Sequence, residues 1–500
     1  MPSKQTTCDG IEGEKVQQEH GFAQRARAGI IWVYSFGRIA TGIKNNLLGT
    51  WLLIYYNQVL GLDALLVSAA IAIALVIDAI SDPLVGVLSD RTRTRWGRRH
   101  PFMYVAIIPF ALCYYLLLQD PGEISDSALF WRLLGLMVCL RIAMTFYEVP
   151  RVALAPELTK DYDQRNQISG LGMAFGWLGG AGISAIHMYF FLGDSFFSTT
   201  GYQLLAFWGG LGIFISLAVT AIGTHNLIPD LYVPPARTFD LRIFLREAKQ
   251  TLSNKSWIVL FLAGCIYSLL VGVDTGASTY FNAYLWQWQP NEIASFPLGQ
   301  ASAVIFFALV GPLLAIGRSK KNVAVGIFIC TIIIGPLPII LRLLEPMLGV
   351  ALIPANGTDA LWWILLIHAS ATAALGSLGF IFVASMAMEI VEDVERVTGR
   401  REEGLLGTVD SFVQKLVGAG GVFIAGAIVA WSGFDEPGVT QEMLTGEVIN
   451  RFASAHVVLS LLLPIGSTLL VLMYNIDRKS HQDNVQQLGY VDDANKTSQR

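Results

Sequence analysis

The sequence predicts an all-α polytopic membrane protein of about twelve transmembrane helices in two six-helix bundles. Hydrophobic residues make up 53% of the 500 residues and charged residues 14%, well below the roughly 25% charged residues of ordinary soluble domains. The mean hydropathy is +0.52. The apolar residues also occur in runs long enough to cross about 30 Å of hydrocarbon, which takes about 20 helical residues. Composition and run length therefore both indicate a multi-pass membrane protein.

About twelve segments meet this length criterion. They are residues 29–60, 65–88, 102–118, 129–155, 168–192, 204–222, 258–286, 301–316, 323–344, 361–390, 405–430 and 453–474. The connections between them alternate in charge. Lys and Arg gather in 91–99, 237–255, 318–321 and 396–401, whereas 119–127, 193–202, 287–300, 345–359 and 433–450 contain none. This asymmetry predicts that the basic loops and both termini are cytoplasmic, in a bacterial inner membrane or a plasma membrane.

The long connection at the middle of the chain divides the spans into two sets of six. We expect a cytoplasmic tail, a first bundle, a central cytoplasmic loop, a second bundle and a second cytoplasmic tail. Their predicted bounds are 1–28, 29–224, 225–256, 257–475 and 476–500. Within the central loop, the apolar spacing of residues 241–252 predicts a short helix along the membrane surface.

Two carboxylates interrupt the apolar run of the second span. Asp78 and Asp82 are four residues apart, so a helix presents both on one face. Because ionisable groups in hydrocarbon are costly, the pair favours a cation site, with hard oxygen ligands for Na⁺ or a shared proton. Ser81 adds an oxygen, and Lys415 in the other half would be a competing cation. The alternative is an internal salt bridge that only joins helices.

Of the other ionisable residues inside predicted spans, Lys44, Glu148 and Asp274 are the hardest to explain as groups that reach a span end. The seventh span also ends in an aromatic cluster that includes Tyr280 and Tyr284. Such a cluster suits the stacking of a sugar or another ring-bearing substrate, but it is equally typical of an interfacial aromatic belt. If the cluster stacks against a substrate, we expect Lys44, Glu148, Asp274, Tyr280 and Tyr284 to contribute to a substrate site.

No catalytic motif accompanies these groups. The sequence lacks a Walker-type phosphate loop, a His-Glu-x-x-His zinc motif and a Gly-x-Ser-x-Gly elbow. We therefore expect a protein that is not an enzyme and has no cofactor beyond a coupling ion. The expected partners are a small-molecule substrate and the lipid bilayer, without nucleic acid, and the expected functional unit is a monomer.

Four stretches resemble the glycoside-pentoside-hexuronide:cation symporters, the melibiose permease group of the major facilitator superfamily. They are Asp78-Ala-Ile-Ser81-Asp82-Pro83 with the loop 90–102, Tyr147-Glu148-Val149-Pro150 with 156–165, Glu389-Ile-Val-Glu392 with 398–404, and Ser411-Phe-Val-Gln-Lys415. The resemblance implies the major facilitator fold.

It also implies a cation site made by Asp78, Ser81, Asp82 and Ser411 with Lys415 beside it, where Asp78 and Asp82 would ligate Na⁺ if the protein is sodium-coupled. The loop of the first stretch resembles a cytoplasmic gating motif. Its residues are Asp90, Arg91, Arg95, Gly97, Arg98 and Arg99.

The substrate positions match the family less well. Glu148 lies where the melibiose permease has an aspartate that contacts sugar, but Gly42, Met173 and Val152 lie where it has a sugar-binding aspartate, an arginine and a tryptophan. Arg151 is the candidate to replace the missing arginine.

The resulting expectation is a secondary active transporter that carries a sugar or glycoside together with Na⁺ or H⁺ by alternating access. The alternatives are a cation-coupled symporter of an amphipathic substrate such as a lysophospholipid, and a sensor that keeps the scaffold without transport.

Overall fold

The computed structural model describes residues 28–159, 162–230, 254–314, 318–398, 403–434 and 444–475. The predicted surface helix 241–252 and most of the predicted tails lie outside these residues. In the first half the elements are α2 (Ala28–Phe36), α3 (Arg38–Asn46), η1 (Leu47–Trp51), α4 (Leu52–Ile54), η2 (Tyr55–Val59), α5 (Ala64–Arg91), α6 (His100–Leu117), α7 (Asp126–Leu158), α8 (Tyr162–Ile186), η3 (His187–Leu192), α9 (Thr199–Gly223) and η4 (His225–Asp230).

The second half is also made of helices. Its elements are α11 (Lys255–Tyr280), η5 (Phe281–Leu285), α12 (Phe296–Leu314), α13 (Lys320–Ile334), α14 (Leu337–Leu348), α15 (Asp359–Thr398), α16 (Glu403–Ser432), η6 (Leu444–Val448) and α18 (Ile449–Leu472). Apart from one isolated bridge in the loop 92–99, the regular elements of the described residues are all helical. The predicted all-α membrane fold is confirmed.

Ten helices of the described residues are long and apolar enough to cross a membrane, and Phe296–Gly311 is a shorter apolar helix. The first predicted span, 29–60, is helical almost throughout, but two wide turns, η1 and η2, divide it into shorter pieces. In η1, the indole of Trp51 donates a hydrogen bond to Asn46 Oδ1 at 2.9 Å, and Trp51 is fully buried. Wide turns of this kind are frequent at functional sites.

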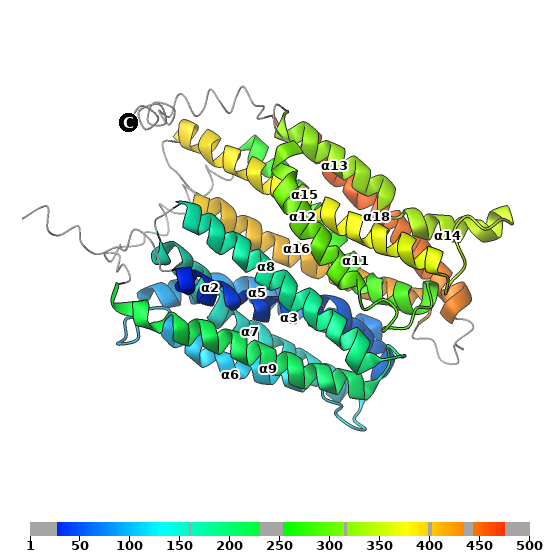
Figure 1. The fold of residues 1–500 in the computed structure, drawn as a ribbon, viewed down its shortest axis with the longest axis horizontal. Coiled ribbons are helices and arrows are strands. Elements are labelled where there is room, and N and C mark those ends of the chain that lie inside the picture. The colour runs from blue at the N-terminus through cyan, green and yellow to red at the C-terminus, as the bar shows by residue number, and fades with distance from the viewer. Residues whose placement is uncertain are drawn as a thin grey trace, which may run out of the picture.

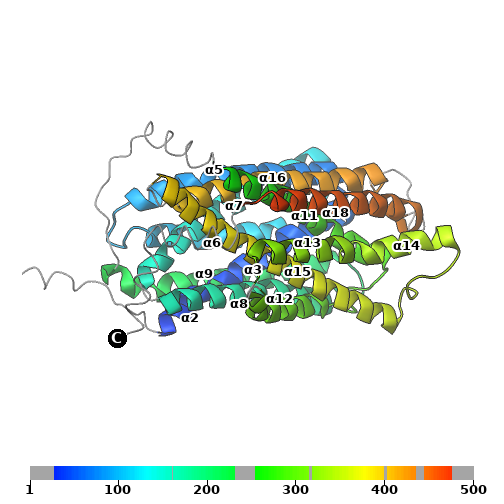
Figure 2. The ribbon, with the colours of Figure 1, turned by 90° about the horizontal axis from the view of Figure 1, so that it is seen from above.

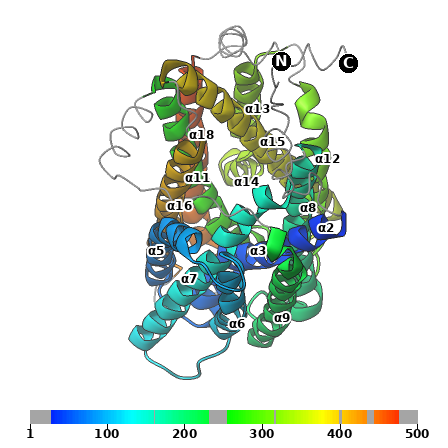
Figure 3. The same ribbon diagram turned by 90° about the vertical axis from the view of Figure 1, so that its left-hand side faces the viewer.

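The helices run side by side (Figures 1 and 2) and separate into two groups in the view of Figure 1. The elements from α2 to α9 form one group and those from α11 to α18 form the other, as the end-on view of Figure 3 shows. Several contacts join the groups: α5 packs against α16, α8 packs against α12, and α11 packs against η1 and α4. We call the end that carries the loop 92–99 the basic end, and the end that carries the loops 119–125 and 193–198 the opposite end.

Side-chain caps fix where several helices begin. Asp63 accepts hydrogen bonds from the backbone of Leu65 at 2.7 Å and Leu66 at 3.2 Å at the start of α5. Ser125 accepts one from Ala128 at 3.3 Å at the start of α7. Such caps satisfy N–H groups that have no partner inside the helix. They fix the start of the two helices that carry the acidic pair and its nearest neighbours.

Glycines bring α3 and α8 into backbone contact. A Cβ atom at Gly42 would lie 2.0 Å from the carbonyl oxygen of Gly176, and one at Gly179 would lie 2.4 Å from that of Ile39. No heavier residue fits at these distances. Small residues allow helices to approach this closely, and the contact sets how far the polar residues of α3 reach into the centre of the protein.

We expect Gly42→Ala to destabilise the protein by about 1–3 kcal/mol, because the methyl group has to push two backbones apart. Gly182→Ala on α8 is the matched control, since a Cβ atom there meets nothing within 4 Å. Both changes gain the same helix propensity, so the difference reports the clash. Thermal unfolding of the purified protein measures it, and equal melting temperatures for the two variants would contradict the close contact.

Candidate functional site

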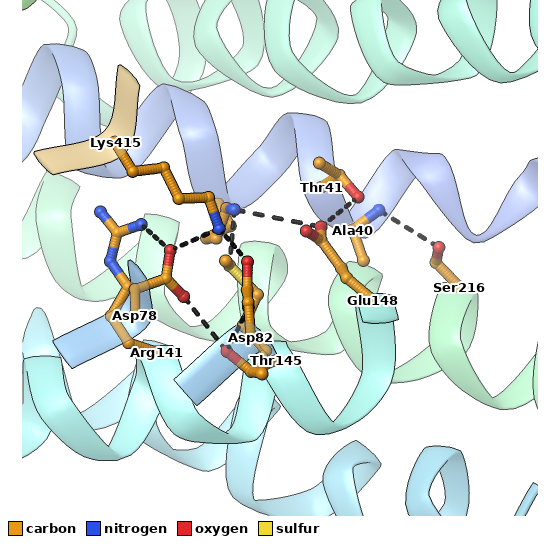
Figure 4. A network of polar contacts seen from close by, with 11 residues as sticks. Ala40, Thr41, Asp78, Asp82, Arg141, Thr145, Glu148, Ser216 and Lys415 are labelled. Atoms are coloured by element: carbon orange, nitrogen blue, oxygen red, sulfur yellow. Dashed lines mark hydrogen bonds and ion pairs between the residues drawn. The ribbon is translucent and has the colours of Figure 1, made fainter. Parts of the chain in front are cut away.

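The predicted acidic pair lies where three helices meet (Figure 4). Asp78 on α5 is fully buried, whereas the side chain of Asp82 is 27% exposed. Lys415 reaches both carboxylates from α16: its Nζ atom is 3.0 Å from Asp78 Oδ2 and forms an ion pair with Asp82 Oδ2. Because α5 and α16 belong to different halves of the chain, these ion pairs connect the two bundles.

α7 supplies two further partners. Arg141 Nη1 is 3.4 Å from Asp78 Oδ2. The hydroxyl of Thr145 lies 3.2 Å from Asp78 Oδ1 and 3.0 Å from Asp82 Oδ1, and 3.0 Å from the hydroxyl of Ser81. Since a hydroxyl has one proton, Thr145 donates to one carboxylate at a time and accepts from other groups. We call Asp78, Asp82, Thr145 and Ser81 the oxygen cluster.

The cluster has the chemistry of a cation site. Carboxylate and hydroxyl oxygens are the ligands that hard cations prefer, and Asp78 and Asp82 are balanced in charge by Arg141 and Lys415. The two cations differ in exposure: the side chain of Lys415 is 29% exposed and that of Arg141 is 9% exposed. Lys415 is therefore the more accessible of the two counter-charges.

Arg141 and Thr145 were not predicted as site residues. A signal for them exists in the sequence, because Arg141, Thr145 and Glu148 recur at i, i+4 and i+7 on one face of α7. α16 continues through position 411, but the side chain of the predicted ligand Ser411 lies outside the described residues.

Glu148 forms a second polar centre on the same face of α7. It accepts a hydrogen bond from the hydroxyl of Thr41 at 2.7 Å, and Lys44 Nζ is 4.0 Å away. Lys44 is buried and also donates to the sulfur of Met144 at 2.6 Å. The structure thus brings the predicted residues Lys44 and Glu148 together on the α3 side of α7.

A cavity of about 720 Å³ opens between the two bundles. Both bundles contribute to its wall, through α3 and α8 on one side and α11, α12, α14 and α15 on the other. The polar and aromatic side chains of the wall are Arg38, Thr41, Asn45, Asn46, Thr50, Trp177, Ser184, Thr275, Ser278, Phe281, Asn282, Trp286, Phe296, Gln300, His368 and Thr372. Thr41 belongs to the wall and bonds Glu148, so it links the cavity to the polar network of α7.

The described cavity wall contains none of the six predicted substrate residues, which are Lys44, Glu148, Arg151, Asp274, Tyr280 and Tyr284. Arg151 is 2% exposed, and its guanidinium lies over the ring of Tyr34, 5.2 Å from the centroid. Asp274 Oδ1 is 2.9 Å from His456 Nε2 on α18. Of the positions that depart from the family pattern, Gly42 and Met173 do line the cavity.

Tyr280 and Tyr284 join the bundles at the opposite end. Tyr280 donates a hydrogen bond to Asn57 Oδ1 at 2.8 Å, and Tyr284 donates one to Gln58 Oε1 at 2.5 Å. Both rings are buried and pack on Phe434. These contacts place the two tyrosines between the bundles rather than against the cavity.

We expect the double variant Tyr280→Phe, Tyr284→Phe to open the opposite end more often, because two hydrogen bonds between the bundles are lost. At about 1 kcal/mol each, the loss of both raises the open population about thirtyfold. An impermeant maleimide reports it by labelling Asn282→Cys in a chain whose natural cysteines are serine. Tyr189→Phe, at an exposed ring, is the control, and unchanged labelling would show that these bonds do not hold the end closed.

The predicted gating motif forms a tight turn at the basic end. The backbone N–H of Gly97 donates to Thr94 O at 3.0 Å, and Gly97 has φ +76°, which favours glycine. Arg95 lies over the ring of Trp96 at 5.1 Å. Arg98 and Arg99 also lie in this loop, whereas the side chains of Asp90 and Arg91 lie outside the described residues. The role of the motif in gating stays a prediction.

Comparison with known proteins identifies the family. The model of the family described as MFS/sugar transport protein matches residues 33–478. The chain belongs to this family. It is 25% identical over 539 aligned residues to a symporter of Synechocystis sp., covering 91% of this chain and 95% of that protein. It is 24% identical to the isoprimeverose transporter of Lactiplantibacillus pentosus, covering 89% of this chain and 88% of that protein.

The chain is also 30% identical over 176 residues to a sodium-dependent lysophosphatidylcholine symporter of Danio rerio. This shorter match covers 34% of this chain and 32% of that protein. Among solved structures, a peptide transporter superposes with a TM-score of 0.58 at 15% identity, covering 92% of this chain and 99% of that chain. This likeness shows the fold alone. The predicted major facilitator fold and the predicted resemblance are confirmed, and the protein is a multi-pass membrane protein of a transporter family.

Proposed function

We propose that the protein is a symporter that carries a sugar or glycoside together with Na⁺ or H⁺ by alternating access. The observation that carries the proposal is the ion pair of Lys415 with Asp78 and Asp82, which joins the bundles through a group that a coupling cation can replace. A cavity between the same bundles supplies room for a small-molecule substrate. The sugar class rests on the family and on the isoprimeverose transporter.

Coupling follows from the order of the polar groups. A cation that enters the oxygen cluster takes the carboxylate oxygens from Lys415, because two positive charges a few ångströms apart in a poorly solvated site repel strongly. Lys415 and α16 are then released from α5. The next turns of α7 carry Glu148, whose partner Thr41 lines the cavity. Cation occupancy and substrate occupancy therefore act on one connected set of helices.

The proposal includes a cell-membrane location with the basic end and both termini in the cytoplasm, since that is the side on which basic loops collect. It also includes a monomer as the functional unit, a small-molecule substrate, and neither an enzymatic activity nor a nucleic-acid partner.

An amphipathic substrate is the second candidate. The match to the lysophosphatidylcholine symporter supports it. So does the replacement of family sugar contacts by Gly42 and Met173, both of which line the cavity.

Uptake by proteoliposomes under an imposed Na⁺ or pH gradient tests the proposal. We expect accumulation of at least one glycoside from a radiolabelled panel above its equilibrium level, with one of the two gradients only. Uptake of lysophosphatidylcholine without any glycoside would favour the second candidate. Binding without transport, under either gradient, would overturn the symporter and favour a sensor.

A further inference from the structure

Arg38 is a cation in the cavity wall without an anion at ion-pair distance among the described residues. Among the described residues that line the cavity, it is the only side chain with a formal charge at neutral pH. Its stem packs on α8, where a Cβ atom at Gly172 would lie 3.5 Å from Arg38 Cγ. Within the part of the chain that the structure describes, its guanidinium forms no ion pair and no hydrogen bond. A charge held in this way inside a membrane protein is costly and marks a functional group.

Among the described residues, the surroundings of Arg38 carry an excess of positive charge. Glu148 interacts electrostatically with Lys44, Arg151 and Arg38 and with Arg141, and of these Lys44 lies at ion-pair distance, 4.0 Å away. The other two acids of the network do not offset this excess, because Asp78 and Asp82 are already matched by Arg141 and Lys415. Arg151 is buried against Tyr34 and Lys44 is directed at Glu148. Arg38 is therefore the cation of this group that faces the cavity.

We propose that Arg38 binds an anionic group of the transported substrate, so that the substrate is an acidic sugar or glycoside. This inference rests on the proposed function and names its substrate class. The anionic group is a carboxylate or a phosphate, the two groups that the planar guanidinium binds through paired hydrogen bonds. One negative charge on the substrate offsets part of the local excess, which a neutral sugar does not.

The rest of the wall suits such a substrate. Thr41, Asn45 and Asn46 continue along the same helix from Arg38 and offer hydroxyl and amide groups for sugar hydroxyls. Trp177 on α8 offers a ring for the apolar face of a sugar. The described wall contains no carboxylate, so an acidic substrate meets no like charge there.

Matched ligand pairs test the inference on the purified full-length protein. The probes are 4-nitrophenyl β-D-glucuronide against the glucoside, the corresponding galacturonide against the galactoside, and glucose 6-phosphate against glucose. We expect wild type to bind at least one acidic member about tenfold more tightly than its neutral partner, which corresponds to one charge-assisted contact. The choice between hexuronide and phosphate identifies the group.

Arg38→Gln is expected to remove this preference, and Arg38→Lys to keep part of it, because lysine retains the charge without the paired geometry. Arg318→Gln, at an exposed residue of a basic loop, is the control, and melting temperatures verify that each variant is folded.

Three outcomes would each overturn the inference: equal affinities within every pair, no binding of any acidic probe, or a preference that survives in Arg38→Gln. Gradient-driven uptake of neutral glycosides alone would do so while leaving the proposed symport intact, whereas absence of all gradient-driven uptake would overturn symport itself.

Discussion

Asp82→Asn is expected to abolish accumulation of substrate against its gradient while leaving facilitated exchange. Asp82 is the more exposed carboxylate of the oxygen cluster, and it bonds both Thr145 and Lys415. The amide keeps the shape but removes the charge that attracts the coupling cation. Because a hydrogen bond or contact to a charged group contributes about 1.5–3 kcal/mol, the apparent cation affinity should fall about tenfold to a hundredfold.

Proteoliposomes separate the two activities. Uptake under a Na⁺ or pH gradient measures coupling, and counterflow without a gradient measures exchange. Asp126→Asn is the matched control, since Asp126 is exposed in the first turn of α7 at the opposite end. Accumulation by Asp82→Asn at the wild-type level would show that this carboxylate is not part of the coupling site.

The spans themselves follow from the sequence because lipid imposes one rule on the whole chain, that every run facing it is apolar and long enough to cross. The irregular turns inside the first span do not follow from this rule. The wide turns at Leu47–Trp51 and Tyr55–Val59 lie in an apolar segment whose pattern favours a uniform helix. The buried Trp51 indole at this break packs edge-on against His187, with ring centroids 4.8 Å apart, and against Tyr202, 6.4 Å apart, and both neighbours are distant in the chain.

The site residues also differ in whether local sequence or distant contacts determine their role. Asp78 and Asp82 are recognisable because both their spacing and their cost in hydrocarbon are local properties. Arg38 is not, because only the contact of α3 with the glycine face of α8 decides whether its guanidinium reaches the cavity or a helix end. The aromatic residues Tyr280 and Tyr284 suit a substrate site and a bundle contact equally well by composition, and their partners Asn57 and Gln58 come from the other half of the chain.

Asp78→Ala is expected to destabilise the protein strongly, by about 3–5 kcal/mol. Asp78 is the carboxylate nearest to Arg141, whose side chain is 9% exposed. Removing the acid leaves this arginine as a buried charge without a counter-charge at ion-pair distance. Arg141→Met should cost less, because Asp78 keeps its ion pair with Lys415. Thermal unfolding of the purified variants measures the order of the two effects.

The double variant Asp78→Ala, Arg141→Met separates a structural ion pair from a cation ligand. It removes both buried charges at once, so its stability should return towards wild type, and the double-mutant cycle should show a coupling energy of about 0.5–3 kcal/mol. Stabilisation by Na⁺ or by lower pH, measured as a shift in melting temperature, should nevertheless be lost, because one of the two carboxylates is gone. A double variant that is stable and still responds to the cation as wild type does would mean that Asp78 only joins α5 to α7, and that Asp82 acts without it.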